Sequence, residues 1–482
     1  MKSLRWAIAC VLALAWGALA PAPLSAHAAE VDDIPLLMIV VGFDGGDNPE
    51  AAVAYDENID WNAALFGPSE TPASYFLDVS NGLFTFVSAP ETSAGGIGGN
   101  TNVADRANDG IVHVTLHRPH GAWGPVNVEN SVARDFAQMV MDAMEAAAPY
   151  VDFASFDTDG NGILSQQELT VCICVAGYEA SSVVDFRRDD IPLTWSHAGL
   201  LTVLGQGDKV VDDVRFETYM AIAERYWEDG DPLDTTQQEP LGIVYHELGH
   251  ALGLPDLYAV TYTEGPWSDY TVGELSLMDS GGWQYADDGN GWRNIPTSLD
   301  AWSRYVLGWA KPTLVTASGD YRVSSQWSDT GYAPLLIPTS DPDQYFLVEN
   351  RQAEGHDVSL EESGLVVWHV DNGMYELYYD ANQVNDANHR PCVMCERLDG
   401  AIELLLYDKN NDIPDARKGS GISVRVDGAP SRDMVVHVDM DNHEGAMNAL
   451  HVLDDYALSQ LRMTAEPLLL EKVATIVKAV AQ

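Results

Sequence analysis

The chain has 482 residues, of which 46% are hydrophobic, and its 73 acidic against 25 basic residues give a net charge of −48. This excess of negative charge repels phosphate backbones, so we exclude nucleic acid as a partner. The length and apolar content suffice for more than one domain. Solubility in salty surroundings, carboxylates that bind Ca²⁺, or both would explain the acidic excess.

The N-terminus has the features of a secretory signal. Lys2 and Arg5 precede an apolar run over residues 6–20, and Ala-His-Ala at 26–28 is a cleavage site of small residues. The run holds about 15 apolar residues, fewer than the roughly 20 needed to cross a bilayer. We therefore expect residues 1–28 to be removed and the mature protein to be secreted to the extracellular space or the periplasm, without stable membrane insertion.

The next part of the chain alternates strand and helix signals. Residues 34–41 form a continuous apolar run, which is typical of a buried strand. Aromatic and β-branched residues at 75–87 surround Asn81-Gly82, which predicts a hairpin. Apolar residues at helical spacing over 132–148 predict a helix, and residues 169–176 read as a second buried strand.

Four cysteines follow the signal, and their even number in an exported chain favours disulfides. The candidate disulfide cysteines are Cys172, Cys174, Cys392 and Cys395. Three pairings are open, and alternation along the predicted strand places the first two cysteines on one face. A zinc site made of all four thiolates is the alternative, which the C-x-C spacing of the first pair disfavours.

Residues 157–168 fit the twelve-residue EF-hand template for calcium. Side-chain oxygens, one backbone carbonyl, one water-mediated contact and a bidentate carboxylate would come, in chain order, from Asp157, Asp159, Asn161, Ile163, Ser165 and Glu168. Gly162 permits the sharp turn that such a loop requires. A strand signal follows the loop in place of a second helix, so we expect a structural Ca²⁺ and not a sensor. The alternative interpretation is a polar turn.

A helix is predicted from about residue 239 to residue 252, with Thr235-Thr236 as its N-cap, Pro240 in its first turn and Gly253 as its stop. His246 and His250 lie four residues apart and share one helix face, so both imidazoles can bind a single Zn²⁺. Glu247 lies beside the open ligand position of such an ion. A carboxylate there can act as general base on a zinc-bound water.

The residues around the helix add to this pattern. Gly253 allows a sharp turn that can return Asp256 to the metal as a third ligand. Met278 follows at the position of a Met-turn beneath such a site. The alternatives are an ordinary helix with two surface histidines and a zinc site without activity.

Beyond this region a helix is predicted over 298–309, and residues 320–440 alternate short apolar runs with Gly, Asp and Asn, a β-rich pattern. The stretch 446–480 is helical again. We interpret His369, Asp371 and His389 as polar residues at strand ends in preference to a metal cluster, and His197 as a hydrogen-bonded structural residue.

Several segments together resemble the immune inhibitor A family of secreted bacterial zinc metalloproteases. The most specific are HELGHALGLPDLY at 246–258, SLMDSGGW at 276–283 and LDAWSRYVLGWAKPT at 299–313. Supporting segments are DTDGNG at 157–162, TWSHAG at 194–199, YFLVENRQ at 345–352 and GLVVWHVDNG at 364–373. The resemblance covers residues 34 to 440.

This resemblance implies a metzincin-like catalytic domain, calcium-stabilised, followed by a β-rich domain. It also implies that His246, His250 and Asp256 bind zinc and that Glu247 is the general base. The cysteines of Pro-Cys-Val-Met-Cys at 391–395 match no family pattern.

We therefore expect an α+β protein in four parts: a signal peptide (1–28), a zinc metalloprotease domain (29–311), a β-rich, sandwich-like domain (312–440) and a helical tail (441–482). The expected function is zinc-dependent endopeptidase activity on protein or peptide substrates. An adhesin-like protein on an inactive protease fold and a zinc amidase for cell-wall peptides are the alternatives. Tyr285 is a guess for the residue that assists at the oxyanion, and the oligomeric state stays open.

Overall fold

The computed structural model describes residues 31–92, 106–123, 131–181, 191–202, 204–227, 239–260, 265–268, 271–287, 292–408, 414 and 417–440. The expected signal peptide, the expected C-terminal tail and Thr235-Thr236 lie outside these residues. Among the helices in the described part of the chain, none combines the length and the apolar character that a membrane crossing requires.

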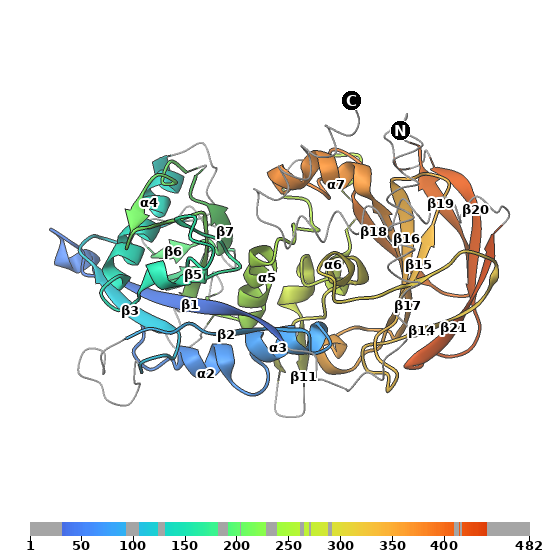
Figure 1. The fold of residues 1–482 in the computed structure, drawn as a ribbon, viewed down its shortest axis with the longest axis horizontal. Helices are drawn as coiled ribbons and strands as arrows, with labels where there is room; N and C mark the ends of the chain where they lie inside the picture. Colours follow the sequence, from blue (N-terminus) through green and yellow to red (C-terminus); the bar gives the residue numbers. More distant parts are fainter. Residues whose placement is uncertain are drawn as a thin grey trace.

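A seven-stranded, mostly parallel sheet forms the N-terminal half of the structure (Figure 1). Its centre holds β1 (Asp32–Phe43), β5 (Thr170–Glu179) and β10 (Thr218–Arg225), which are parallel. The other strands are β2 (Phe84–Ser88) and β3 (Ile111–Leu116) beside β1, β6 (Leu193–Thr194) beside β5, and the antiparallel edge strand β7 (His197–Leu200) beside β10.

Both faces of this sheet are buried, which explains the continuous apolar runs that predicted its strands. Along β1, Leu36 and Met38 enter one hydrophobic core, whereas Leu37 and Ile39 enter a second core on the opposite face. Helix α4 (Ser131–Ala147) covers the second core, and helices α3 (Pro72–Val79) and α5 (Leu241–Ala251) pack into the first. The predicted strands at 34–41 and 169–176 and the predicted helix at 132–148 are confirmed.

The predicted hairpin around Asn81-Gly82 is wrong. Helix α3 occupies its first half, where the Thr71 hydroxyl accepts from the Ser74 N–H in a capping box. Asn81 and Gly82 do adopt positive φ angles, but they end this helix: the Gly82 N–H donates to the Leu77 carbonyl at 2.7 Å. Strand β2 then pairs in parallel with β1, so helix capping and packing on the sheet outweigh the β-propensity of the segment.

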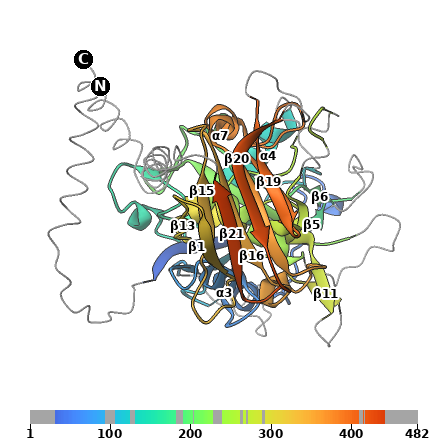
Figure 2. The same cartoon turned by 90° about the vertical axis from the view of Figure 1, so that its right-hand side faces the viewer.

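Two antiparallel-rich sheets form the C-terminal half. The five-stranded sheet contains β13 (Thr313–Leu314), β15 (Leu335–Pro338), β16 (Gln344–Arg351), β17 (Gly364–Asp371) and β18 (Val393–Leu398). The four-stranded sheet contains β14 (Gly319–Ser324), β21 (Asp433–Met440), β20 (Arg417–Val426) and β19 (Ala401–Tyr407). Figure 2 shows the two sheets stacked, and their facing side chains, such as Ile337 and Val436, form a third core. The α+β class is confirmed.

Short elements connect these layers. They are α2 (Trp61–Phe66), α6 (Ala301–Val306), α7 (Asn372–Tyr378), the 3₁₀ turns η1 (Pro49–Ala51), η3 (Phe153–Phe156), η4 (Gly273–Leu275), η5 (Ser280–Trp283), η6 (Gly355–Asp357) and η7 (Tyr379–Ala381), the hairpin β11 (Tyr285–Asp287) with β12 (Trp292–Asn294), and the small sheet of β4 (Ile163–Leu164), β9 (Val214–Phe216) and β8 (Val210–Val211). Helix α6 is shorter than the predicted 298–309, because Asp300 is its N-cap and accepts from the Ser303 N–H.

The first hydrophobic core crosses residue 312, where the sequence pattern changes. It joins Met38 of β1 and Leu248 of α5 to Leu347 and Trp368 of the five-stranded sheet. Helices α5 and α6 lie between the two halves in Figure 1. The two halves therefore share one packed interior, which includes the apolar residues of α5.

The disulfides expected among the cysteines do not form. Cys172, Cys174, Cys392 and Cys395 are all free, and burial raises the pKa of each thiol. The first two are neighbours on one face of β5, about 6.6 Å apart along the strand, whereas the Cβ atoms of a disulfide lie about 3.8 Å apart. Of the last two, Cys392 lies just before β18 and Cys395 within it. Within the described residues these thiols belong to no candidate metal cluster either.

Candidate metal centre

Helix α5 positions the two histidines, and it begins differently from the prediction. It starts at Leu241 after Pro240, and the Asn294 side chain accepts from the Gly242 N–H at 2.8 Å. The cap thus comes from β12, more than fifty residues away in sequence. A Cβ at Gly242 would lie 1.9 Å from the Gly282 carbonyl oxygen, so only glycine allows η5 to approach this closely. The predicted stop is confirmed, because Gly253 has a φ of 87°.

The imidazoles of His246 and His250 are each fixed by a backbone carbonyl. Nδ1 of His246 lies 2.9 Å from the Leu277 oxygen, and Nδ1 of His250 lies 2.8 Å from the Leu254 oxygen. Carbonyl oxygens only accept, so both Nδ1 atoms carry the proton in a neutral ring and both Nε2 atoms keep a lone pair. Second-sphere carbonyls that orient histidine in this way are usual at metal sites.

Asp256 completes the cluster. Its Oδ1 lies 3.0 Å from Nε2 of His246 and 3.2 Å from Nε2 of His250. Four ligands at about 2.0 Å in a tetrahedron are about 3.3 Å from one another. The three donor atoms therefore have the types and the spacing that fit Zn²⁺, and they form one of two candidate metal clusters among the described residues.

The charges of the cluster favour a cation at its centre. The Asp256 side chain is 6% exposed, and although burial opposes ionisation, the two imidazoles hold its pKa well below the usual range. Burial likewise lowers the pKa of His250, but the Asp256 carboxylate outweighs it and raises that pKa to about 9. The pKa of His246 is raised against burial by the same carboxylate. A buried carboxylate thus stabilises positive charge between the rings, whether that charge is carried by protons or by a metal ion.

Glu247 follows the first histidine and faces the same interior. It is 5% exposed, and its Oε2 atom has no hydrogen-bond partner. Burial raises the pKa of its carboxyl to about 7, although both imidazoles act to lower it. A buried carboxylate with an unused acceptor atom beside a cation site is suited to bind and deprotonate a water molecule.

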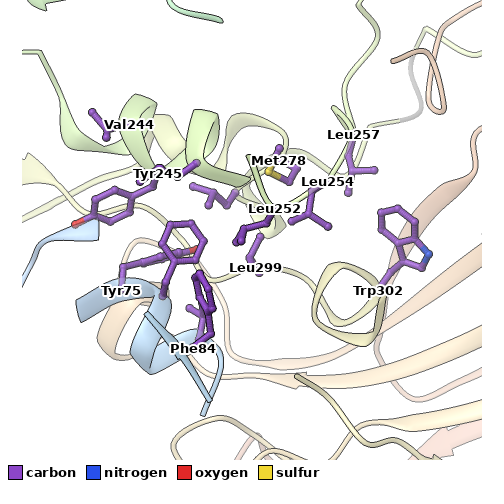
Figure 3. Packing of buried hydrophobic residues seen from close by; sticks show 14 of the residues in the cluster. Tyr75, Phe84, Val244, Tyr245, Leu252, Leu254, Leu257, Met278, Leu299 and Trp302 are labelled. Atoms are coloured by element: carbon purple, nitrogen blue, oxygen red, sulfur yellow. The ribbon is translucent and has the colours of Figure 1, made fainter. Parts of the chain in front are cut away.

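Met278, the residue of the predicted Met-turn, packs against helix α5 close to the cluster. Its side chain is fully buried, and its carbonyl accepts from the Leu257 N–H at 2.8 Å. A Cβ at Gly249 of α5 would lie 2.4 Å from the Met278 sulfur. Figure 3 shows Met278 packed with Leu254 and Leu257 under the end of the helix. The Met278 turn therefore supports the loop of Asp256 and, through the preceding Leu277 carbonyl, His246.

Two groups near the cluster were not found from the sequence. The Tyr258 ring stacks on His246 with centroids 6.1 Å apart, and it is 40% exposed at the site. The Asn382 amide contacts Asp256 from the C-terminal half. Tyr258 belongs to the HELGHALGLPDLY segment and could have been found there, but Asn382 has no signal in its local sequence. Tyr285, the guess for an assisting residue, lies exposed on β11.

The predicted calcium loop folds around its own carboxylates. Oxygens of Asp157, Asp159 and Glu168 lie within 4.8 Å of one another and form the second candidate metal cluster among the described residues. Asp157 accepts from the N–H groups of Asn161 and Gly162. These backbone bonds, that of Gly162 above all, lower the pKa of the Asp157 carboxyl.

The remaining predicted ligands of this loop lie around the same carboxylates. The carboxylate of Glu168 accepts from the N–H and hydroxyl of Ser165 and from the Thr158 N–H. Ile163 begins β4, which pairs with β9, and its N–H donates to the Asn161 side chain. Strand β5 follows the loop, as predicted, in place of a helix.

The weaker histidine candidates are structural in character. His369 is buried between the rings of Phe346 and Tyr407, and its Nε2 hydrogen-bonds to the Gln344 side chain. Asp371 pairs with Arg390 at 2.7 Å. His197 hydrogen-bonds through both ring nitrogens, to the Trp195 carbonyl and the Tyr219 hydroxyl.

Comparison with known families identifies the region around the cluster. Residues 117–310 match the family model described as immune inhibitor A peptidase M6, catalytic domain. This part of the chain is therefore similar to the catalytic domain of the immune inhibitor A family. The match includes α5, Asp256 and the Met278 turn, and it ends before β13 and before Asn382. No individual curated protein matches the chain. The region is thus a peptidase domain, of metallopeptidase type, and its substrates are proteins or peptides.

Proposed function

We propose that the protein is a zinc-dependent endopeptidase whose zinc ligands are His246, His250 and Asp256. The observation that carries this proposal is that the Nε2 atoms of both histidines lie within 3.2 Å of the same Asp256 oxygen. The family supports the peptidase reaction, and the donor set of two imidazoles with one carboxylate is that of catalytic zinc sites, which keep a position open for water.

Glu247 is the proposed general base. A bound zinc ion would polarise the scissile carbonyl and lower the pKa of a bound water. Glu247 takes the proton of the attacking water and delivers it to the leaving amine as the peptide bond breaks. Its buried, unpartnered Oε2 atom leaves an acceptor available for this proton. Tyr258, whose ring lies against His246, is a better placed candidate than Tyr285 to contact the substrate carbonyl.

The loop 157–168 is proposed to bind a structural Ca²⁺. Its three clustered carboxylates and its glycines at positive φ, Gly160 and Gly162, suit an oxygen-ligated ion. The loop leads directly into β5, the central strand of the sheet. Ca²⁺ would therefore stabilise the start of that strand and take no part in catalysis.

Secretion is a further proposal and rests on the sequence features of residues 1–28. The acidic surface and the calcium loop suit a protein exposed to millimolar Ca²⁺, which extracellular sites use. Cleavage after residue 28, detected by N-terminal analysis of protein from the culture medium, is the expected result. A chain retained in the cytoplasm with an intact N-terminus would contradict it.

The test of the proposed function combines metal content with proteolysis. Purified protein should contain one zinc ion per chain and hydrolyse casein or quenched peptides, and 1,10-phenanthroline should abolish hydrolysis until zinc is restored. Glu247→Ala should keep the zinc and lose the activity, whereas Glu145→Ala, an exposed glutamate on α4, should change neither. Proteolysis that survives in Glu247→Ala would contradict the proposed mechanism.

A further inference from the structure

The third ligand of the proposed zinc site is held by a residue of the C-terminal half. Asn382 contacts Asp256 twice: its side-chain NH₂ donates to Oδ2 of Asp256 at 2.6 Å, and its side-chain oxygen accepts from the Asp256 N–H at 2.8 Å. These two residues are 126 positions apart in sequence. The side-chain amide of Asn382 therefore hydrogen-bonds to both the carboxylate and the backbone of Asp256.

The first contact assigns a role to each carboxylate oxygen. Oδ2 is occupied by the amide, and Oδ1 is left facing both Nε2 atoms at 3.0 and 3.2 Å. Rotation of the carboxylate about its Cβ–Cγ bond would break the hydrogen bond from the Asn382 amide. One oxygen alone is therefore presented to the cluster. A side chain with a single free oxygen is a monodentate ligand, which suits a four-coordinate ion.

The conformation of Asn382 is suited to this contact. It follows η7 with φ 52° and ψ 42°, in the left-handed region, where asparagine is tolerated better than most residues. Its neighbours are anchored independently. The Tyr379 hydroxyl donates to the Gly253 carbonyl at 2.9 Å, and the Asn385 amide donates to the carbonyls of Leu257 and Val393. The segment would thus stay docked on the Asp256 loop without the Asn382 side chain.

We propose that Asn382 is a positioning residue that orients Asp256 for monodentate zinc binding, so that the metal affinity of the peptidase domain depends on the C-terminal half. This inference rests on the proposed zinc function. Hydrogen bonds to a ligating carboxylate from outside the ligand set commonly contribute about tenfold to a hundredfold in metal affinity. Asn382 lies beyond the residues that match the peptidase family.

The variant Asn382→Gly tests the proposal, because glycine retains the left-handed backbone conformation and removes only the amide. Zinc affinity, measured by competition with a chromogenic chelator, should fall about tenfold to a hundredfold. Tyr379→Phe is the matched control: it removes a hydrogen bond from the same segment to the same loop without touching the ligand. This control should keep zinc affinity within about twofold of the wild type.

A double-mutant cycle shows whether Asn382 acts through Asp256. In an Asp256→Ala background, Asn382→Gly should cause no further loss of zinc affinity. The absorption spectrum of the Co²⁺-substituted protein should also change in Asn382→Gly, because the coordination of the carboxylate changes, and should be retained in Tyr379→Phe.

The outcomes separate this inference from the proposed function. Equal affinities in Asn382→Gly and the wild type, or equal losses in Asn382→Gly and Tyr379→Phe, would overturn the positioning role and leave the zinc proposal intact. A wild-type chain that binds no zinc would overturn both.

Discussion

The two candidate metal sites of this protein are built in opposite ways. All donors of the calcium loop come from residues 157–168, and their oxygens are held by backbone N–H groups of the same loop. The cluster of His246, His250 and Asp256 is largely buried, and its donors are oriented by the Leu277 carbonyl, the Leu254 carbonyl and the Asn382 amide. One site is therefore local, whereas the other requires both halves of the fold.

The carboxyl pKa values of Asp157 in one region and of Glu247 in the other are also shifted in opposite directions. Backbone hydrogen bonds lower the pKa of Asp157 in the exposed loop. Burial raises the pKa of Glu247 at the zinc cluster and of Glu239 just before helix α5. Buried carboxylates with raised pKa values and unused acceptor atoms are suited to proton transfer. Carboxylates whose oxygens accept backbone hydrogen bonds are suited to a structural role. Four predictions test this contrast, from the largest expected effect to the smallest.

Removal of one zinc ligand should have the largest effect. His250→Ala should lose stoichiometric zinc, and hydrolysis should fall on the order of a thousandfold or more, because several kcal/mol of transition-state stabilisation is lost. His117→Ala, which removes an exposed histidine paired with Asp44, should keep both zinc and activity. Metal analysis and peptide hydrolysis measure these outcomes, and a His250→Ala protein with normal zinc content would refute the ligand assignment.

Loss of the buried Arg351 side chain, which contacts both halves, should come second. Arg351 of β16 binds Asp357 at 2.6 Å and donates to the Leu275 carbonyl near the Met278 turn. Arg351→Met leaves the buried Asp357 carboxylate without its ionic partner, so the free energy of unfolding should fall by about 3–5 kcal/mol. Arg432→Met breaks an exposed pair with Glu354 and should cost about 0–1 kcal/mol. Denaturant titration of both variants measures the free energy of unfolding. A similar decrease in both variants would mean that the buried contacts of Arg351 do not stabilise the fold more than an exposed ion pair does.

Calcium removal should lower the stability of the fold without lowering the rate of peptide hydrolysis. With Ca²⁺ at about a hundredfold above its dissociation constant, binding contributes about 2.7 kcal/mol, so EGTA should lower the melting temperature by several degrees. Glu168→Gln should weaken this response, and Glu361→Gln, at an exposed position, should retain it. Peptide hydrolysis at low temperature should persist in EGTA. A melting curve that EGTA leaves in place would exclude a calcium site here.

Replacement of the buried Glu239 carboxyl, just before helix α5, should have the smallest effect. Glu239 is 2% exposed, both its carboxylate oxygens lack partners, and burial raises its pKa well above the usual value. A raised folded-state pKa means that stability is highest at low pH and is lost as pH rises above the unfolded-state value. Glu239→Gln should therefore stabilise the protein near neutral pH by about 1 kcal/mol and flatten this pH dependence. Melting temperatures between pH 4 and 8, with Glu396→Gln as the exposed control, measure the difference; a lower stability of Glu239→Gln at neutral pH would contradict the assignment.

The same contrast explains what the sequence could predict. The carboxylate cluster of the loop 157–168, the strand of residues 34–41 and the proximity of His246 to His250 depend on local spacing, and the sequence pattern predicted all three arrangements. The Asn294 cap of α5 and the Asn382 contact with Asp256 depend on residues brought together by the fold, and no local pattern reveals them. The hairpin at Asn81-Gly82 failed because the capping box at Thr71 and packing on the sheet determined a helix there.

The most direct test of the account is anomalous X-ray scattering at the zinc edge from crystals of the zinc-loaded protein. The account predicts one strong peak between Nε2 of His246, Nε2 of His250 and Oδ1 of Asp256, with Oδ2 still bound to the Asn382 amide. A peak elsewhere, or rings of His246 and His250 turned away from a common centre, would contradict it.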